Sequence, residues 1–142
     1  MGLFKRSDAA AKNDIRTLLE RVQRSVAIIN GTDEVATYFV AWNRMTMDLD
    51  RLLEYERAGE PFTPSIAETR ERILAQKKAA ELALIGRADA ASRRAVEALA
   101  SPKSKQSKRD SFFGEFAMYD NQMEPESVAW LARLRAQEET AE

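Results

Sequence analysis

Apolar side chains recur at intervals of three and four residues through most of this chain, and this spacing constrains the fold most strongly. Over residues 13–29 it places on one side of a helix the residues Ile15, Leu18, Leu19, Val22, Val26 and Ile29. Asn30 and Gly31 follow as a stop signal, because glycine accepts the left-handed conformation that closes many helices. The sequence therefore predicts a helix over residues 13–29, preceded by a flexible N-terminus over residues 1–12.

A second helix is predicted over residues 33–58, with Thr32 or Asp33 as its cap. Its apolar stripe is the richest in the chain and contains Val35, Tyr38, Phe39, Trp42, Met45, Leu49, Leu52 and Leu53. The segment TYFVAW, residues 37–42, has the composition of a strand. The helical spacing continues beyond it, so we expect a helix throughout.

A long third helix is predicted over residues 66–100. Ser65 and Glu68 form an S-x-x-E capping box at its start, and Ser101 with Pro102 ends it. Unbroken, it would span about 52 Å at the helical rise per residue. Gly86 is the one weak point, since glycine costs about 1 kcal/mol relative to alanine inside a helix, and the sequence leaves open whether it breaks the helix.

The C-terminal part combines a basic linker, residues 101–111, with an apolar segment, residues 112–142. The segment is expected to be helical, with Pro125 in the first turn of a short helix. Its aromatic residues need a surface to cover them: Phe112, Phe113, Phe116, Tyr119 and Trp130. The end of the long third helix offers that surface, either in the same chain or in a second subunit.

These patterns predict an all-α fold. We expect a three-helix antiparallel bundle over residues 13–100 with a long third helix, and a short C-terminal helical segment docked through the basic linker. The length of 142 residues suits one domain. No strand alternation and no internal repeat is visible in the sequence.

Two residue types that carry much of enzyme chemistry are missing, since the chain contains neither cysteine nor histidine. Thiolate nucleophiles, disulfides and imidazole proton transfer are therefore excluded. No glycine-rich phosphate-binding loop is present. We accordingly expect no enzyme activity, no cofactor and no small-molecule substrate.

One acidic cluster still raises the question of a metal or acid–base site. Asp50 and Glu54 lie four residues apart on one helical face, and Asp48 is near. Arg44 and Arg51 lie among these acids. We favour ordinary surface ion pairs over a metal site.

The basic run is the candidate contact surface. Lys103, Lys105, Lys108 and Arg109 could bind phosphates, and the neighbouring aromatic residues could stack on bases. No groove-entering motif accompanies them, and the net charge of the chain is only −1. A soluble linker that docks its aromatic residues is the favoured interpretation, and nucleic-acid binding is the alternative.

A membrane role is less favoured. The start MGLFKRSD places Leu3 and Phe4 beside Lys5 and Arg6, but the myristoylation pattern requires Ser or Thr where Arg6 stands. The longest apolar run, residues 38–42, is too short for a membrane span, and no secretory signal is visible. We expect a cytoplasmic protein.

Four stretches carry a loose resemblance to known proteins: VAIINGTDEVATYFVAWNRM, LLEYE, SIAETRERI and EFAMYD. In these the chain resembles uncharacterised small helical proteins of Gram-positive bacteria and of their phages and mobile elements. The resemblance implies an all-α, intracellular protein of bacterial or phage origin, and no catalytic residues.

The sequence therefore predicts a non-enzymatic helical module for protein–protein interaction or scaffolding, with a protein partner or self-association. A nucleic-acid accessory protein that uses the basic run is the alternative, and a peripheral membrane protein is a more distant one.

Overall fold

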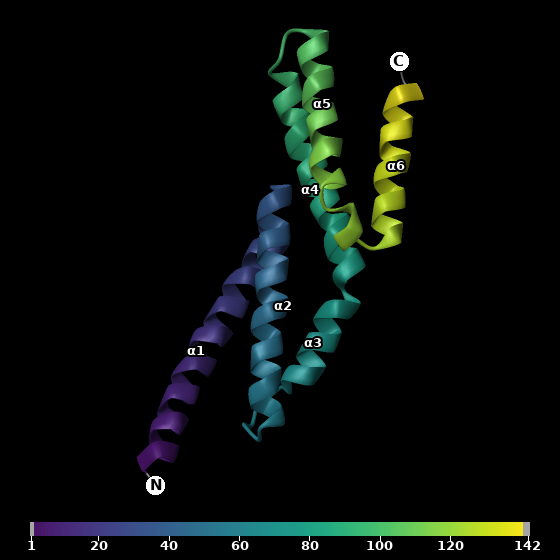
Figure 1. The fold of residues 1–142 in the computed structure, drawn as a ribbon. Coiled ribbons are helices and arrows are strands. Elements are labelled where there is room, and N and C mark those ends of the chain that lie inside the picture. Colours follow the sequence, from purple (N-terminus) through teal and green to yellow (C-terminus); the bar gives the residue numbers. More distant parts are fainter. Residues whose placement is uncertain (1, 141–142) are drawn as a thin grey trace.

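Helices make up nearly all of the computed structural model, which describes residues 2–140 (Figure 1). In chain order they are α1 (Gly2–Gly31), α2 (Val35–Arg57), α3 (Ile66–Ala75), α4 (Lys77–Glu97), α5 (Pro102–Ala117), the 3₁₀ turn η1 (Asp120–Gln122) and α6 (Pro125–Thr140). No strand occurs among the described residues, so the predicted all-α class is confirmed. Within this part of the chain, no helix has the length and apolarity needed to cross a membrane.

The helices α1 and α2 form an antiparallel pair (Figure 1). Leu18 and Ile29 of α1 are buried together with the α2 stripe that the sequence predicted. The helix α1 begins at Gly2, eleven residues before the predicted start at residue 13. Ala9, Ala10 and Ala11 are the strongest helix formers, and no proline or glycine separates them from the apolar stripe.

The predicted long third helix is two helices. α3 ends at Ala75 and α4 begins at Lys77, with Gln76 between them at φ −93° and ψ 2°. Gly86, the predicted weak point, lies inside α4. The change of direction at Gln76 keeps α3 beside α2 while α4 continues to α5 and α6 (Figure 1).

The start of α3 is capped from α2 and not by the predicted capping box. Ser65 makes no side-chain cap. The carboxylate of Glu56 instead accepts from the backbone N–H of Ile66 at 2.8 Å, from that of Ala67 at 3.0 Å and from the Ser65 hydroxyl at 3.1 Å. The two backbone donors lower the pKa of Glu56 below its ordinary value, because they stabilise the charged form.

The basic segment predicted as a linker is the first part of α5. Pro102 occupies the start of this helix, and the Ser101 hydroxyl accepts from the backbone N–H of Ser104 at 3.3 Å. Proline in the first turn and serine at the cap are strong start signals, and lysine, glutamine and arginine continue a helix well. The linker prediction missed this combination.

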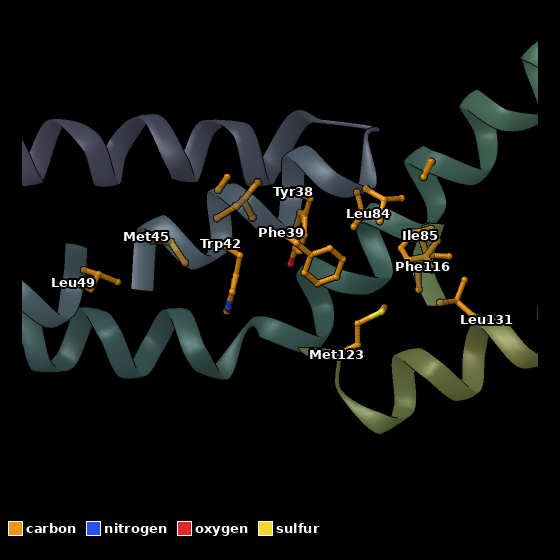
Figure 2. Packing of buried hydrophobic residues seen from close by; sticks show 14 of the residues in the cluster. Tyr38, Phe39, Trp42, Met45, Leu49, Leu84, Ile85, Phe116, Met123 and Leu131 are labelled. Carbon is orange, nitrogen blue, oxygen red and sulfur yellow. The ribbon is translucent and has the colours of Figure 1, made fainter. Parts of the chain in front are cut away.

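The C-terminal helices pack on α4 of the same chain. Phe116 of α5 and Leu131 of α6 lie beside Ile85 of α4 (Figure 2). The helices α1 to α3 thus occupy one end of an elongated molecule and α4 to α6 the other (Figure 1). A single hydrophobic cluster joins the two ends where Tyr38 and Phe39 of α2 approach Leu84 (Figure 2). The predicted bundle of three antiparallel helices is therefore not confirmed.

Candidate interaction surfaces

The four cations of the basic run do not share one face of α5. Lys103 and Lys108 are exposed, Lys105 is half-buried, and Arg109 is buried with 8% of its surface exposed. Because successive residues turn by about 100° in an α-helix, Lys103 and Lys105 lie on nearly opposite sides. The structure therefore does not bring these cations together as one phosphate-binding surface.

Arg109 joins three helices through its guanidinium group. Its Nη2 lies 2.7 Å from Oδ1 of Asp89, its Nη1 donates to the Ser92 hydroxyl at 3.1 Å, and its Nε donates to Oε1 of Glu138 at 2.9 Å. Nη2 also contacts Glu138. Asp89 and Ser92 belong to α4 and Glu138 to α6, so this one side chain fastens α5 to both neighbours.

The electrostatics of this network favour a structural role for Arg109. Burial alone would lower its pKa, but hydrogen bonds to Glu138 and Asp89 outweigh burial and raise it. Its guanidinium carbon also lies 4.6 Å from the centre of the Phe112 ring. Arg109 was predicted as a partner contact, and its position in the core corrects that prediction.

The five predicted interaction aromatics separate into core and surface residues. Phe112, Phe113 and Phe116 are buried and pack edge to face, with ring centres 4.8 Å and 5.3 Å apart. The half-buried Tyr119 stacks on Phe39 at 4.4 Å. Trp130 remains 47% exposed. The three phenylalanines thus bury the C-terminal helices on α4, as the docking of this segment requires.

A groove opens where the start of α2 meets α4 and α5, and we call it the α4–α5 groove. Its volume is about 540 Å³. Small residues of α4 form one wall, among them Ala91 and Ala95, and the opposite wall includes Phe112 and Tyr119. Met118, which is 73% exposed, also lines it. One lysine of the basic run, Lys108, reaches this groove.

The acidic residues considered for a metal site point to different helices. Asp48 is buried and its Oδ2 lies 3.2 Å from Nε of Arg21 in α1. Asp50 pairs with Arg70 of α3 at 2.8 Å. Within the described residues, no cluster of three acidic or other ligating side chains is arranged to hold a metal ion.

Sequence reasoning missed a buried carboxylate, Glu81, which is 1% exposed. Its Oε1 accepts from the Ser127 hydroxyl at 2.7 Å and from the backbone N–H of Glu124 at 2.9 Å, which fixes the start of α6. Burial raises the pKa of the Tyr38 hydroxyl, and the charge of Glu81 raises it further. The signal was present in the sequence, because Glu81 lies on the apolar stripe of Leu84 and Ile85.

Arg87 was also missed, although it connects α4 to the end of α1. Its Nε donates to the carbonyl oxygen of Thr32 and its Nη2 to that of Ile29, each at 2.7 Å. These carbonyl groups lie at the negative end of the α1 dipole, where a cation is favourable. The contact sets the position of the α1–α2 pair relative to α4.

Among the surfaces described above, the α4–α5 groove is the open groove that contains aromatic residues predicted from the sequence. Its lining contains apolar side chains together with polar and charged ones, among them Lys108, Ser111 and Glu115. Comparison with known proteins shows that the sequence matches no family model, and that no curated protein and no solved structure matches it.

Proposed function

We propose that this protein is a non-enzymatic helical interaction module that binds a helical segment of a partner protein in the α4–α5 groove. The observation that carries the proposal is the groove itself, whose lining is mostly apolar and whose volume is about 540 Å³. Exposed apolar surface of this kind is typical of sites where one protein docks on another.

The shape of the groove favours a helix as the occupant. Ala91 and Ala95 lie four residues apart on one face of α4, and their side chains are short. Short side chains allow two helix backbones to approach closely, and the ridges of an incoming helix can fit between α4 and α5. The half-buried Tyr119 then provides aromatic surface for the apolar side of that helix.

Residues around the groove add adaptability and orientation. Met118 is flexible and polarisable, and methionine is enriched in protein interfaces. Lys108, Glu115 and Asp33 also line the groove, so both signs of charge are available to orient the partner. The same chemistry would accept a helix of a second copy, which makes self-association the other version of this proposal.

The basic run gives less support to nucleic-acid binding. Arg109 is buried, and Lys103 and Lys105 lie on different sides of α5. A mobility-shift assay at low salt with all three lysines reversed to glutamate checks this. We expect weak binding, if any, and the same result for the wild-type and reversed proteins.

Site-specific photo-crosslinking tests the proposal. A benzophenone side chain at Met118 should crosslink to a discrete partner, or to a second copy, in cells that make the protein. The substitution Ala91→Arg fills the groove and should abolish that product. Ala90→Arg is the matched control, since Ala90 is the exposed neighbour on α4 and does not line the groove. Light scattering then separates a foreign partner from self-association.

The proposal fails if no discrete product forms at Met118. It also fails if Ala91→Arg and Ala90→Arg reduce the product equally, because the groove would then not be the binding surface. Circular dichroism of both variants must show the wild-type helix content for the comparison to count.

A further inference from the structure

A second groove follows the seam between α1 and α2, and we call it the α1–α2 cleft. Its basic half has a volume of about 490 Å³ and is lined by Arg21, Arg24, Ser25, Ile28, Arg44 and Asp48. An adjoining hollow of about 280 Å³ shares Ser25, Ile28 and Arg44 with it and adds Val40. The two are therefore halves of one groove, which extends along about three turns of helix, or about 16 Å.

The basic half carries surplus positive charge. Arg21 is paired with the buried Asp48, with Nε 3.2 Å from Oδ2. Arg24 and Arg44 are both exposed, and within the described residues neither forms an ion pair. Two guanidinium groups, one from each helix, are thus available at the same hollow.

The other half of the cleft is apolar and open to solvent. Ile28 is 40% exposed and Val40 is 49% exposed, on facing sides of the seam. Ala36 and Ala41 also line this half, and Thr37 adds a polar group. Large aliphatic side chains beside unpaired arginines form a surface with one cationic end and one apolar end.

We propose that the α1–α2 cleft binds an acidic amphipathic helix of a partner protein. Carboxylates on the bound helix would pair with Arg24 and Arg44, and its apolar side chains would cover Ile28 and Val40. Arginine suits this task, because its planar fork donates two parallel hydrogen bonds to one carboxylate. A helix fits because the groove between two packed helices accepts the side-chain ridges of a third.

Other classes of ligand would use only half of the cleft. A small anion would occupy the arginine half and leave Val40 exposed in the other half. A nucleic-acid strand would supply phosphates for Arg24 and Arg44, but no aliphatic side chain to cover the apolar half. An acidic amphipathic helix matches both halves, and this complementarity selects it as the occupant.

The α4–α5 groove and the α1–α2 cleft share one lining residue, Ala36, but Arg24, Arg44 and Val40 line only the cleft and Ala91 lines only the groove. Variants of one leave the other intact, so failure of one proposal does not decide the other. If both hold, the protein has two binding surfaces of different chemistry and can bring two partners together.

The test uses a fluorescein-labelled, helix-stapled peptide of about three turns, with glutamates toward one end of a face and leucines toward the other. Fluorescence anisotropy measures its affinity for the full-length protein. Arg24→Glu with Arg44→Glu should weaken binding at least about tenfold, and added salt should weaken wild-type binding. The milder double variant, Arg24→Gln with Arg44→Gln, should have an affinity between those of the wild type and the glutamate variant.

The matched control reverses two exposed arginines on other faces of the same helices, Arg16 and Arg57. This control variant should bind like the wild type. A peptide with lysine in place of glutamate should bind the Arg24→Glu, Arg44→Glu protein better than it binds the wild type. Such a charge swap supports direct pairing, because a loss of folding cannot create new affinity.

Several results would overturn the proposal. One is no binding of the acidic peptide by the wild type at low salt, and another is equal loss of binding in the cleft and control variants. Equal binding of a glutamine-substituted peptide would remove the role of the arginines. Sedimentation showing that the cleft variants abolish a dimer, with no peptide binding, would assign the cleft to a second copy.

Discussion

Replacement of Arg109 by methionine tests whether the basic run is a structural part of the fold. Methionine keeps the unbranched apolar part of the side chain, which is 10% exposed in Arg109, and removes the guanidinium group between Asp89 and Glu138. The two carboxylates then keep only Arg93, whose side chain is 53% exposed, as a cation that pairs with both. Ser92, which is buried, also loses a donor.

The loss of stability depends on how much water reaches the carboxylates of Asp89 and Glu138 once the guanidinium group is gone. Removal of one partner from a fully buried ion pair costs about 3–5 kcal/mol. The side chains of Asp89 and Glu138 keep 21% and 26% exposure, so solvent compensates part of that loss. We expect a decrease of about 2–4 kcal/mol in the free energy of unfolding, which corresponds to a melting temperature about 5–15 °C lower.

Urea denaturation followed by circular dichroism measures this change. Lys108→Met is the matched control, because it removes the same charge from the neighbouring exposed position and should change stability by less than about 0.5 kcal/mol. Adding Glu138→Gln to Arg109→Met should recover part of the loss, since one of the two neighbouring carboxylate charges is removed. Equal stability of the two single variants would refute the network and restore the linker interpretation.

Two further predictions concern helices α3 and α4. The pKa of Glu56 is lower in the folded state than its ordinary value of 4.5, so its stabilising effect is complete above pH 4.5 and is lost as the pH falls through the folded-state pKa. Glu56→Gln should therefore lower the urea midpoint at neutral pH and lower it less at about pH 3; an offset independent of pH would contradict the capping role. Gly86→Ala should raise stability by about 0.5–1 kcal/mol, because Gly86 lies inside α4 and an added Cβ meets no atom within 4 Å. A lower melting temperature for this variant would show that α4 bends at Gly86.

Local sequence patterns predicted the helical class and the second helix well. That helix was predicted over residues 33–58 and runs over Val35–Arg57. They failed at Gln76, where no proline or glycine marks the break between α3 and α4. The break serves packing, since α3 lies against α2 and α4 lies against α5 and α6.

The candidate surfaces were harder to predict than the helices, because they depend on contacts between residues far apart in the sequence. The sequence identified Phe112, Phe113 and Phe116 as residues in need of cover, but not their arginine neighbour as part of the same core. The sequence did not indicate that Arg24 and Arg44 of the α1–α2 cleft lack ion-pair partners. Charged residues in a sequence look alike whether or not the fold places an opposite charge beside them. Only the register of α1 against α2 places Arg24 near Arg44.

The amino-acid sequence by itself determined that this chain is helical and where most of its apolar stripes lie, because helical periodicity is set by neighbours within one or two turns. Only the tertiary structure decided which charges are buried and which stay free. Arg109 meets Glu138 across 29 residues of chain. Such long-range pairing decides whether a cation is buried as part of the core or stays exposed and able to bind a ligand. A charge tolerates burial only when an opposite charge lies beside it.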